Sequence, residues 1–288
     1  MAYKIYGSGM IDTVVFMGLC GCIAEYSRLA ALLAQDGHTV LVYERYGCGS
    51  SEEAKTARTP ENIAKECMEL LQRLQCSKKL TLLAHSQGGL YANQFARKYP
   101  DCIKKVLLLD PLSARDALFQ ERLTKAEYKK SGVDKTLGLK INLVLAKLHL
   151  GGIIKKMMRQ APPFYYYKNF AAEEEAYILD CLTKPSVYRT ALSEYQYAHE
   201  PDCVEELLQR GSFPNVPICL ITHSSEISVG EIMLFGNTDR GLAQKVEDLW
   251  QEIMKDYLRY SDHASWCQAQ NSSHYIHLTD AELIREKV

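Results

Sequence analysis

Short runs of consecutive apolar residues alternate with stretches of helical spacing along the first part of the chain. The apolar runs, each long enough for one strand, cover residues 13–17, 39–43, 80–84 and 105–109. Helical spacing is found at residues 24–35, 60–74 and 88–99. Nearly continuous apolar strands that alternate with helices are typical of a parallel sheet buried on both faces. The pattern therefore predicts an α/β protein whose mostly parallel central sheet has helices on both faces.

The pattern changes after residue 111. Residues 112–213 show helical spacing, at 137–158, 171–182 and 185–197, but no convincing strand. Apolar strand patterns return at 216–222 and 264–269, and Thr279 with Glu282 has the spacing of a capping box that opens a last helix. We therefore expect an α/β core of residues 1–111 and 214–288, with residues 112–213 inserted as a helical cap, or lid.

Composition excludes several classes of protein. The 288 residues are 47% hydrophobic and 24% charged with a formal net charge of −1, which argues against a disordered chain and against a nucleic-acid partner. No apolar window is long enough for a membrane span, and no secretory signal is readable. The ten cysteines are scattered, which favours reduced thiols in a cytoplasmic protein without a metal site. No pattern indicates an oligomeric state.

The sharpest chemical signal lies where the run 80–84 ends. Ser86 lies two positions after the end of this run, and a helix begins within a few residues. The small residues Ala84 and Gly88 stand two positions before and after Ser86. A strand, a tight turn that carries a serine and a helix, in that order, are the context of a nucleophile elbow. The alternative is a glycine-rich turn whose serine only caps the helix.

A second glycine turn follows the first buried run. The backbone N–H of Leu19, after Gly18, is a candidate donor to a tetrahedral oxyanion, with the N–H of Gln87 as its partner. The alternative is a turn without a further role. The Gly-x-Gly at residues 47–49 is too short for a dinucleotide fingerprint, so we expect a structural loop there and no cofactor.

Four segments together carry a resemblance: the glycine turn at 18–19, the segment 44–50, the elbow at Ser86 and the segment 273–277. In these segments the chain resembles the α/β-hydrolase family, in its branch of serine hydrolases with an inserted helical cap. Met17 and Ala84 depart from the residues most common in the family. The resemblance implies the chain order nucleophile, acid, histidine. It implies His274 as the general base for Ser86, because a serine hydroxyl is a weak nucleophile until an imidazole takes its proton.

The resemblance leaves the acid of the triad open. Glu226 follows the strand pattern after the cap, where most members carry the acid, and is the first candidate. Asp110 ends the strand pattern before the cap and is the alternative acid, as in some branches. Among the other histidines, His277 is a close neighbour of His274, and strand alternation is expected to turn His85 away from Ser86.

The predicted function is a serine hydrolase, an esterase or lipase that acts on a small apolar carboxylic ester or related acyl substrate through a covalent acyl-enzyme. Aminopeptidase, thioesterase and carbon–carbon hydrolase activities use the same catalytic triad and stay open. The alternative is a member of the fold that binds a small ligand with slow or no hydrolysis, or that uses the triad for a lyase reaction.

Two features of the cap bear on this function. Its apolar residues are expected either to line an acyl pocket or to form the core of the cap: Leu143, Val144, Leu148, Phe164, Tyr165, Tyr166 and Tyr167. The basic amphipathic stretch 135–159 would allow a weak contact with a membrane surface, although a solvated helix face is the commoner explanation.

Overall fold

The computed structural model describes residues 1–165 and 170–288. Its centre is a seven-stranded sheet with the order β1-β3-β2-β4-β5-β6-β7. The strands are β1 Tyr3–Tyr6, β2 Thr13–Phe16, β3 Val40–Tyr43, β4 Leu80–His85, β5 Ile103–Leu109, β6 Ile218–His223 and β7 Ala264–Ala269. Only the edge pair β1–β3 is antiparallel. The predicted mostly parallel sheet is confirmed.

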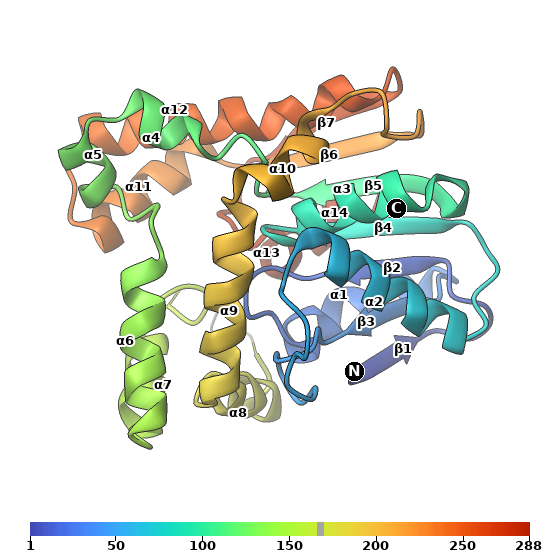
Figure 1. The fold of residues 1–288 in the computed structure, drawn as a ribbon, viewed down its shortest axis with the longest axis horizontal. Helices are drawn as coiled ribbons and strands as arrows, with labels where there is room; N and C mark the ends of the chain where they lie inside the picture. Colours follow the sequence, from blue (N-terminus) through green and yellow to red (C-terminus); the bar gives the residue numbers. More distant parts are fainter. Residues whose placement is uncertain (166–169) are drawn as a thin grey trace.

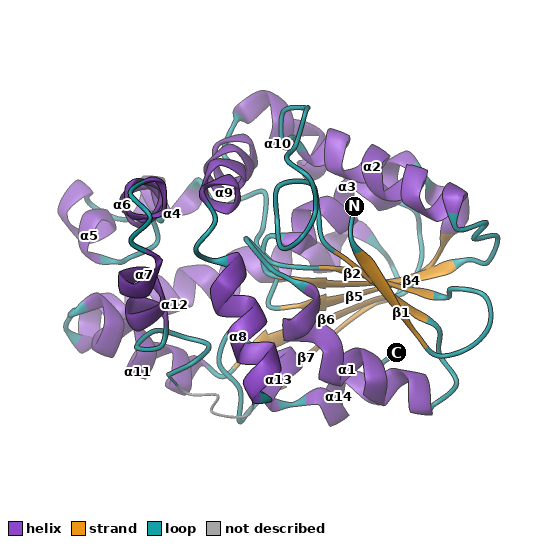
Figure 2. Ribbon diagram, turned by 90° about the horizontal axis from the view of Figure 1, so that it is seen from below, coloured by secondary structure: helices purple, strands orange, loops and turns teal. Residues whose placement is uncertain are grey.

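Helices cover both faces of the sheet (Figure 2). The helices of the core are α1 Ile23–Gln35, α2 Pro60–Arg73, α3 Gly88–Lys98, α13 Ile276–Thr279 and α14 Ala281–Arg285. Successive residues of one strand enter opposite cores: Val14 packs with α2 and α3, whereas Val15 packs with α1 and α14. This alternation explains why the central strands are apolar without interruption, and it confirms the predicted helices on both faces.

In the described residues between β5 and β6 the chain forms helices and loops only. These helices are α4 Leu118–Arg122, α5 Lys125–Lys130, α6 Thr136–Lys147, α7 Gly151–Met158, α8 Ala172–Cys181, α9 Pro185–Ala198 and α10 Pro201–Leu208. They stand largely beyond one end of the sheet (Figure 1). The predicted absence of strands from this region therefore holds for the part that the structure describes, and the boundaries of a cap at 112 and 213 remain a prediction.

Several details differ from the sequence pattern. The stretch 137–158 is two helices, because the chain turns at His149, with φ +57°, and the glycine pair that follows begins α7. The last helix is capped by Asp280, whose side chain accepts the N–H of Leu283, whereas Thr279 closes α13. The edge strand β1 is largely exposed and has no apolar run to reveal it.

Two long helices between β6 and β7 were also not predicted. They are α11 Ser225–Gly236 and α12 Arg240–Lys255. Leu242, Val246 and Leu249 of α12 form a small core with Leu118 and Phe119 of α4. Helices from both insertions therefore meet beyond the same end of the sheet (Figure 1). No helix in the described ranges is both long and apolar enough to cross a membrane.

Candidate active site

Ser86 stands at the sharp turn between β4 and α3. Its backbone is left-handed, with φ +53°, a strained conformation for a residue with a side chain. The turn is tight enough that a Cβ at Gly88 would lie 2.0 Å from the carbonyl oxygen of Phe16. Only glycine avoids this overlap. The strand, turn and helix therefore have the geometry that the sequence predicted around Ser86.

His274 lies between Ser86 and Asp110. Its Nε2 lies 3.0 Å from the Ser86 Oγ, and its Nδ1 lies 2.5 Å from Oδ2 of Asp110. The Asp110 side chain is fully buried, whereas that of His274 is 26% exposed. Asp110 directly follows β5 and also has positive φ, +46°. Three segments far apart in the sequence thus place a hydroxyl, an imidazole and a carboxylate in line.

The structure does not bring Glu226 into this line. Glu226 is exposed in the first turn of α11, and no contact between it and His274 is found in the described residues. The end of β6, where the sequence pattern suggested an acid, instead presents His223 to Asp110. Of the two carboxylates that the sequence left open, Asp110 is therefore the one that contacts His274.

The candidate oxyanion loop lies beside Ser86. A Cβ at Gly18 would come within 3.1 Å of the Cβ of Ser86, so the glycine allows the loop to approach the hydroxyl closely. Within the described part of the chain, no hydrogen bond from the backbone N–H of Leu19 or of Gln87 is found. Both amides are therefore available to an oxygen atom bound near Ser86.

Comparison with known proteins identifies the fold. Residues 14–146, which include Ser86 and Asp110, match the model of the alpha/beta hydrolase fold. The enol-lactonase of Burkholderia xenovorans is structurally similar, with a TM-score of 0.65, 16% identity, and coverage of 99% of this chain and 94% of that one. This chain has the α/β-hydrolase fold.

Curated relatives of this α/β-hydrolase fold protein match it over shorter segments. A proline iminopeptidase of Saccharolobus solfataricus is 31% identical over 114 residues, which cover 39% of this chain and 36% of the relative. A cis-3-alkyl-4-alkyloxetan-2-one decarboxylase of Shewanella oneidensis is 30% identical over 88 residues, which cover 30% of this chain and 27% of the relative. The matches span about a third of the length of these relatives.

Arg45, which follows β3, holds the candidate oxyanion loop of this hydrolase fold by hydrogen bonds to its backbone. Its guanidinium donates to the carbonyl oxygens of Met17, at 2.7 Å, and Gly18, at 2.8 Å. The same group donates twice to the carboxylate of Glu194 on α9, at 2.8 and 2.9 Å. Both side chains are almost fully buried. One planar cation therefore links the loop to a helix of the inserted region.

Two further buried groups, which the sequence reasoning missed, stand behind Asp110. His223 Nδ1 lies 2.6 Å from Asp110 Oδ1, and His223 Nε2 lies 2.8 Å from Oε2 of Glu247 on α12. Burial alone would lower the pKa of His223, but the charges and hydrogen bonds of Asp110 and Glu247 raise it to about 10. Burial alone would raise the pKa of Asp110, and His223 and His274 instead hold it well below its usual range.

His85 packs beneath the site but does not face the serine. Its Nδ1 lies 2.8 Å from the hydroxyl of Tyr26, and its Nε2 lies 2.8 Å from the carbonyl oxygen of His274. Burial lowers the pKa of His85 to about 3, so this imidazole is neutral. His277 is stacked on Tyr26, with ring centroids 4.3 Å apart. Both rings therefore support the loop that carries His274.

The apolar residues singled out in the inserted region divide between two environments. Phe164 is buried against Ile178 and Leu179 of α8, so it belongs to the internal packing of this region. Val144 and Leu148 are 55% and 62% exposed. Tyr166 and Tyr167 lie outside the described residues.

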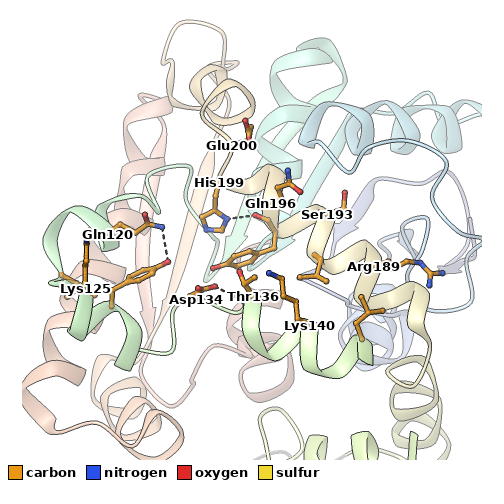
Figure 3. Close-up of a pocket in the computed structure, with 15 residues that line it drawn as sticks. Gln120, Lys125, Asp134, Thr136, Lys140, Arg189, Ser193, Gln196, His199 and Glu200 are labelled. Atoms are coloured by element: carbon orange, nitrogen blue, oxygen red, sulfur yellow. Dashed lines mark hydrogen bonds between the residues drawn. The ribbon is translucent and has the colours of Figure 1, made fainter. Parts of the chain in front are cut away.

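A cavity of about 900 Å³ lies between α5, α6 and α9, and Ser86, His274 and Asp110 do not line it. Thr136 and Lys140 of α6 line it together with Gln196 and His199 of α9 (Figure 3). This hollow is separate from the residues that form the line from Ser86 to Asp110.

Proposed function

We propose that this protein is a serine hydrolase that cleaves a carboxylic ester or related acyl substrate. The observation that carries the proposal is the unbroken contact from the Ser86 Oγ through His274 to Asp110, at 3.0 and 2.5 Å. In this proposal Ser86 is the nucleophile, His274 the general base and Asp110 the acid that orients the imidazole. Glu226 has no part in it.

The proposed reaction has two stages. The Ser86 Oγ attacks the carbonyl carbon and passes its proton to His274 Nε2, while the N–H groups of Leu19 and Gln87 donate to the oxyanion. His274 then gives the proton to the leaving group, which departs and leaves an ester on Ser86. A water molecule loses a proton to His274 and attacks this ester. Collapse of the second tetrahedral intermediate releases the carboxylic acid and restores Ser86.

We further propose that residues 112–213 act as a cap that selects a small apolar substrate. Polar contacts attach the inserted helices to the core beside the site: Tyr177 of α8 donates to Glu44, at 2.8 Å, and Glu194 of α9 pairs with Arg45. The indole of Trp250 on α12 lies 5.9 Å from the His274 ring, between centroids, and adds an apolar wall. The contacts of Tyr177 and Glu194 support a role of the inserted helices in binding a substrate at Ser86.

A fluorophosphonate probe tests the proposal directly, because it labels only an activated serine. We expect the wild type to be labelled and to hydrolyse p-nitrophenyl esters, and Ser86→Ala to do neither. Ser228→Ala, which removes another buried hydroxyl on α11, is the matched control and should keep both activities. The p-nitroanilide of proline belongs in the substrate panel, since a related protein is named a proline iminopeptidase.

A folded wild type that is neither labelled nor active on these substrates would contradict the hydrolase proposal. It would instead favour the alternative, a member of the fold that binds a small ligand without hydrolysis. Binding of an apolar ester without turnover, followed by calorimetry, would identify that case.

A further inference from the structure

We propose that His223 and Glu247 are positioning residues, a buried ion pair that holds Asp110 in line with His274. The proposal rests on the proposed function, because it assigns a role to groups behind the triad. The line then runs through five side chains: Ser86, His274, Asp110, His223 and Glu247. Its inner half comes from the end of β6 and from α12, which lie outside the elbow and the histidine loop.

Every polar atom along this inner half has a close partner. Asp110 Oδ1 accepts from the backbone N–H of His223, at 3.2 Å, in addition to its contact with the ring. Glu247 Oε1 accepts from the amide of Gln251, at 2.9 Å. The side chains of Asp110 and Glu247 are fully buried, and that of His223 is 2% exposed. Such a network is rigid, so it fixes the carboxylate that faces His274.

The hydrogen-bond pattern determines where the protons lie. Each ring nitrogen of His223 faces a carboxylate oxygen, and a neutral imidazole has only one N–H to donate. A cationic His223 satisfies both contacts. The four side chains from His274 to Glu247 then carry one net negative charge at rest. They become neutral when His274 accepts the proton of Ser86 and the negative charge passes to the substrate oxyanion. Without the His223 cation, two buried carboxylates would lie behind His274 with nothing to balance the second.

The groups that face His223 come from several elements. Asp110 and Glu247 contact the ring directly. His274 contacts the other oxygen of Asp110, and Glu231 of α11 lies close enough for the charge of His223 to act on its carboxylate. The carbonyl oxygen of His223 accepts from the amides of Gln251 and Gln268. The Trp250 ring lies 6.0 Å from the His223 ring, between centroids, and shields it from water. The groups around the cation that can titrate are thus the three carboxylates and the imidazole of His274.

The decisive variant is Glu247→Gln. Its amide can donate to Nε2 of a neutral His223, which still donates from Nδ1 to Asp110, so the hydrogen bonds persist while the ion pair is lost. The cation of His223 lies nearer to His274 than the charge of Glu247 does. Loss of the pair therefore favours the protonated form of His274. The labelling rate with a fluorophosphonate is measured against pH. We expect the acid limb of this profile to shift to higher pH by about half a pH unit to one pH unit.

Asp116→Asn is the matched control. It removes the carboxylate of another histidine–aspartate pair, His199 with Asp116 at 2.6 Å, which lies outside the line to Ser86. The pH profile of this variant should coincide with that of the wild type. His223→Gln, which breaks the contact with Asp110, should slow labelling on the plateau by about tenfold to a hundredfold, because the imidazole of His274 is then less well aligned.

The outcomes separate the two proposals. If the wild type is labelled and Glu247→Gln has an unchanged profile, the positioning role is overturned while the hydrolase stands. If the wild type is not labelled at all, the proposed function itself fails. A Glu247→Gln protein that is folded at the assay pH, by its urea unfolding curve, but shows the shifted limb supports the proposal, since a merely structural role would not move the limb.

A different observation carries a second inference, which does not rest on catalysis. Helices α6 and α7 present an apolar face that the described residues leave exposed. Residues spaced three or four apart along α6 and its end are strongly exposed: Leu137 70%, Ile141 47%, Val144 55% and Leu148 62%. On α7, Ile153 and Met157 are 47% and 43% exposed. The opposite side of α6, at Asn142 and Ala146, is buried.

Basic residues border this face. Residues 135–172 contain no Asp or Glu, and they carry six lysines and arginines at positions that the structure describes. Lys155 and Arg159 pair with Asp180 and Glu175 of α8. In the described part of the chain, by contrast, no ion pair to a carboxylate is found for Lys140, Lys147 or Lys156. An apolar stripe beside unpaired lysines has the charge and polarity that a surface of anionic lipid binds.

The apolar surface continues onto a neighbouring helix. Met233 and Leu234 of α11 are 37% and 56% exposed. Tyr165, after α7, contacts Phe235 of α11 edge to face, with ring centroids 5.3 Å apart. The three helices α6, α7 and α11 lie on the same side of the molecule in both views (Figures 1 and 2). We infer that this side, defined by the exposed apolar residues of α6 and α7, docks on an anionic membrane surface.

Co-sedimentation with vesicles of phosphatidylcholine, with and without phosphatidylglycerol, tests this inference. We expect binding only when phosphatidylglycerol is present. The triple change Lys140→Gln, Lys147→Gln and Lys156→Gln should weaken it about a hundredfold, at roughly fivefold for each charge. The double change Ile141→Gln and Val144→Gln should weaken it at least tenfold, by roughly the free energy of burying such side chains.

Matched controls use exposed residues elsewhere. Lys55→Gln with Lys79→Gln and Lys104→Gln removes the same charge, and Met10→Gln removes a 43% exposed apolar side chain. Both should bind as the wild type does. Absence of binding to either vesicle would overturn the inference. So would a dimer, measured by sedimentation velocity, that Ile141→Gln with Val144→Gln dissociates, because a second copy would then cover the face.

Discussion

At the scale of single residues, charge and backbone strain are concentrated around Asp110. Its carboxylate accepts the backbone N–H of His223 and lies 2.6 and 2.5 Å from the rings of His223 and His274. Ser86 and Asp110, which both contact His274, also have left-handed backbones, φ +53° and +46°. Strain of this kind persists only where the surroundings enforce it. Local sequence patterns singled out Ser86 and His274, whose side chains are in contact, but not which carboxylate would reach His274.

Asp110→Asn measures the role of that carboxylate. The amide cannot balance a charged imidazole and favours the wrong tautomer of His274, so turnover of an activated ester should fall about a thousandfold to ten-thousandfold. Glu226→Gln, the change at the other carboxylate, should stay close to the wild type because that side chain is exposed. The reverse result in steady-state kinetics would exchange the two assignments.

Gly88→Ala measures how tightly the elbow is built. A Cβ there would lie 2.0 Å from the carbonyl oxygen of Phe16, and backbone cannot move aside cheaply. We expect the free energy of unfolding in urea to fall by about 2–3 kcal/mol. Gly138→Ala on α6, where no atom lies within 4 Å of the added Cβ, should instead stabilise the protein by about 0.5–1 kcal/mol. Equal effects at the two glycines would contradict the account of the elbow.

At the scale of elements, the site depends on how loops are tied to helices. The candidate oxyanion loop after β2 is held by Arg45, which follows β3, and through it by Glu194 of α9. Glu44, the neighbouring residue, accepts from Tyr177 of α8. Two adjacent residues at the end of one strand thus connect the core to two helices of the insertion. These long-range pairs leave no pattern in the sequence, because the partners lie more than a hundred residues apart.

Arg45→Lys tests whether this link positions the oxyanion loop. An ammonium group cannot reach two carbonyl oxygens and a carboxylate at once, so the Leu19 N–H should lose its alignment. We expect kcat for an ester to fall at least tenfold while KM changes little, since the oxyanion is formed only after binding. Arg58→Lys is a matched control, because Arg58 is equally buried and also paired with a carboxylate, that of Glu66. It should lower stability without lowering kcat.

At the scale of the whole molecule, the ends of parallel strands bring the chemistry together. Ser86, Asp110 and His223 lie at the carboxyl ends of the adjacent strands β4, β5 and β6, and His274 follows β7. The two helical insertions rise from the same edge, and they meet where α4 packs on α12. The sheet therefore acts as the fixed frame, and the insertions provide Glu194, Glu247 and the exposed face of α6 and α7.

The buried ion pair also predicts how overall stability depends on pH. Since folding raises the pKa of His223 from 6.5 to about 10, its contribution is complete below pH 6.5 and is lost as the pH rises through 10. The free energy of unfolding in urea should therefore fall between pH 7 and pH 10, by at least about 1 kcal/mol. Glu247→Gln should flatten this dependence. A wild type whose stability is unchanged over that range would argue against a charged His223.

The sequence alone determined the parallel sheet, the elbow at Ser86 and the loop that carries His274. Each of these depends on neighbours within a few positions, where apolar runs and small residues leave a local pattern. Tertiary structure decided what depends on distant partners. It brought Asp110 rather than Glu226 to His274, placed His223 and Glu247 behind it, and joined Arg45 to Glu194. A carboxylate or an imidazole looks the same in sequence wherever it lies, and only the packing of the strand ends and of α9 and α12 determines which charges meet.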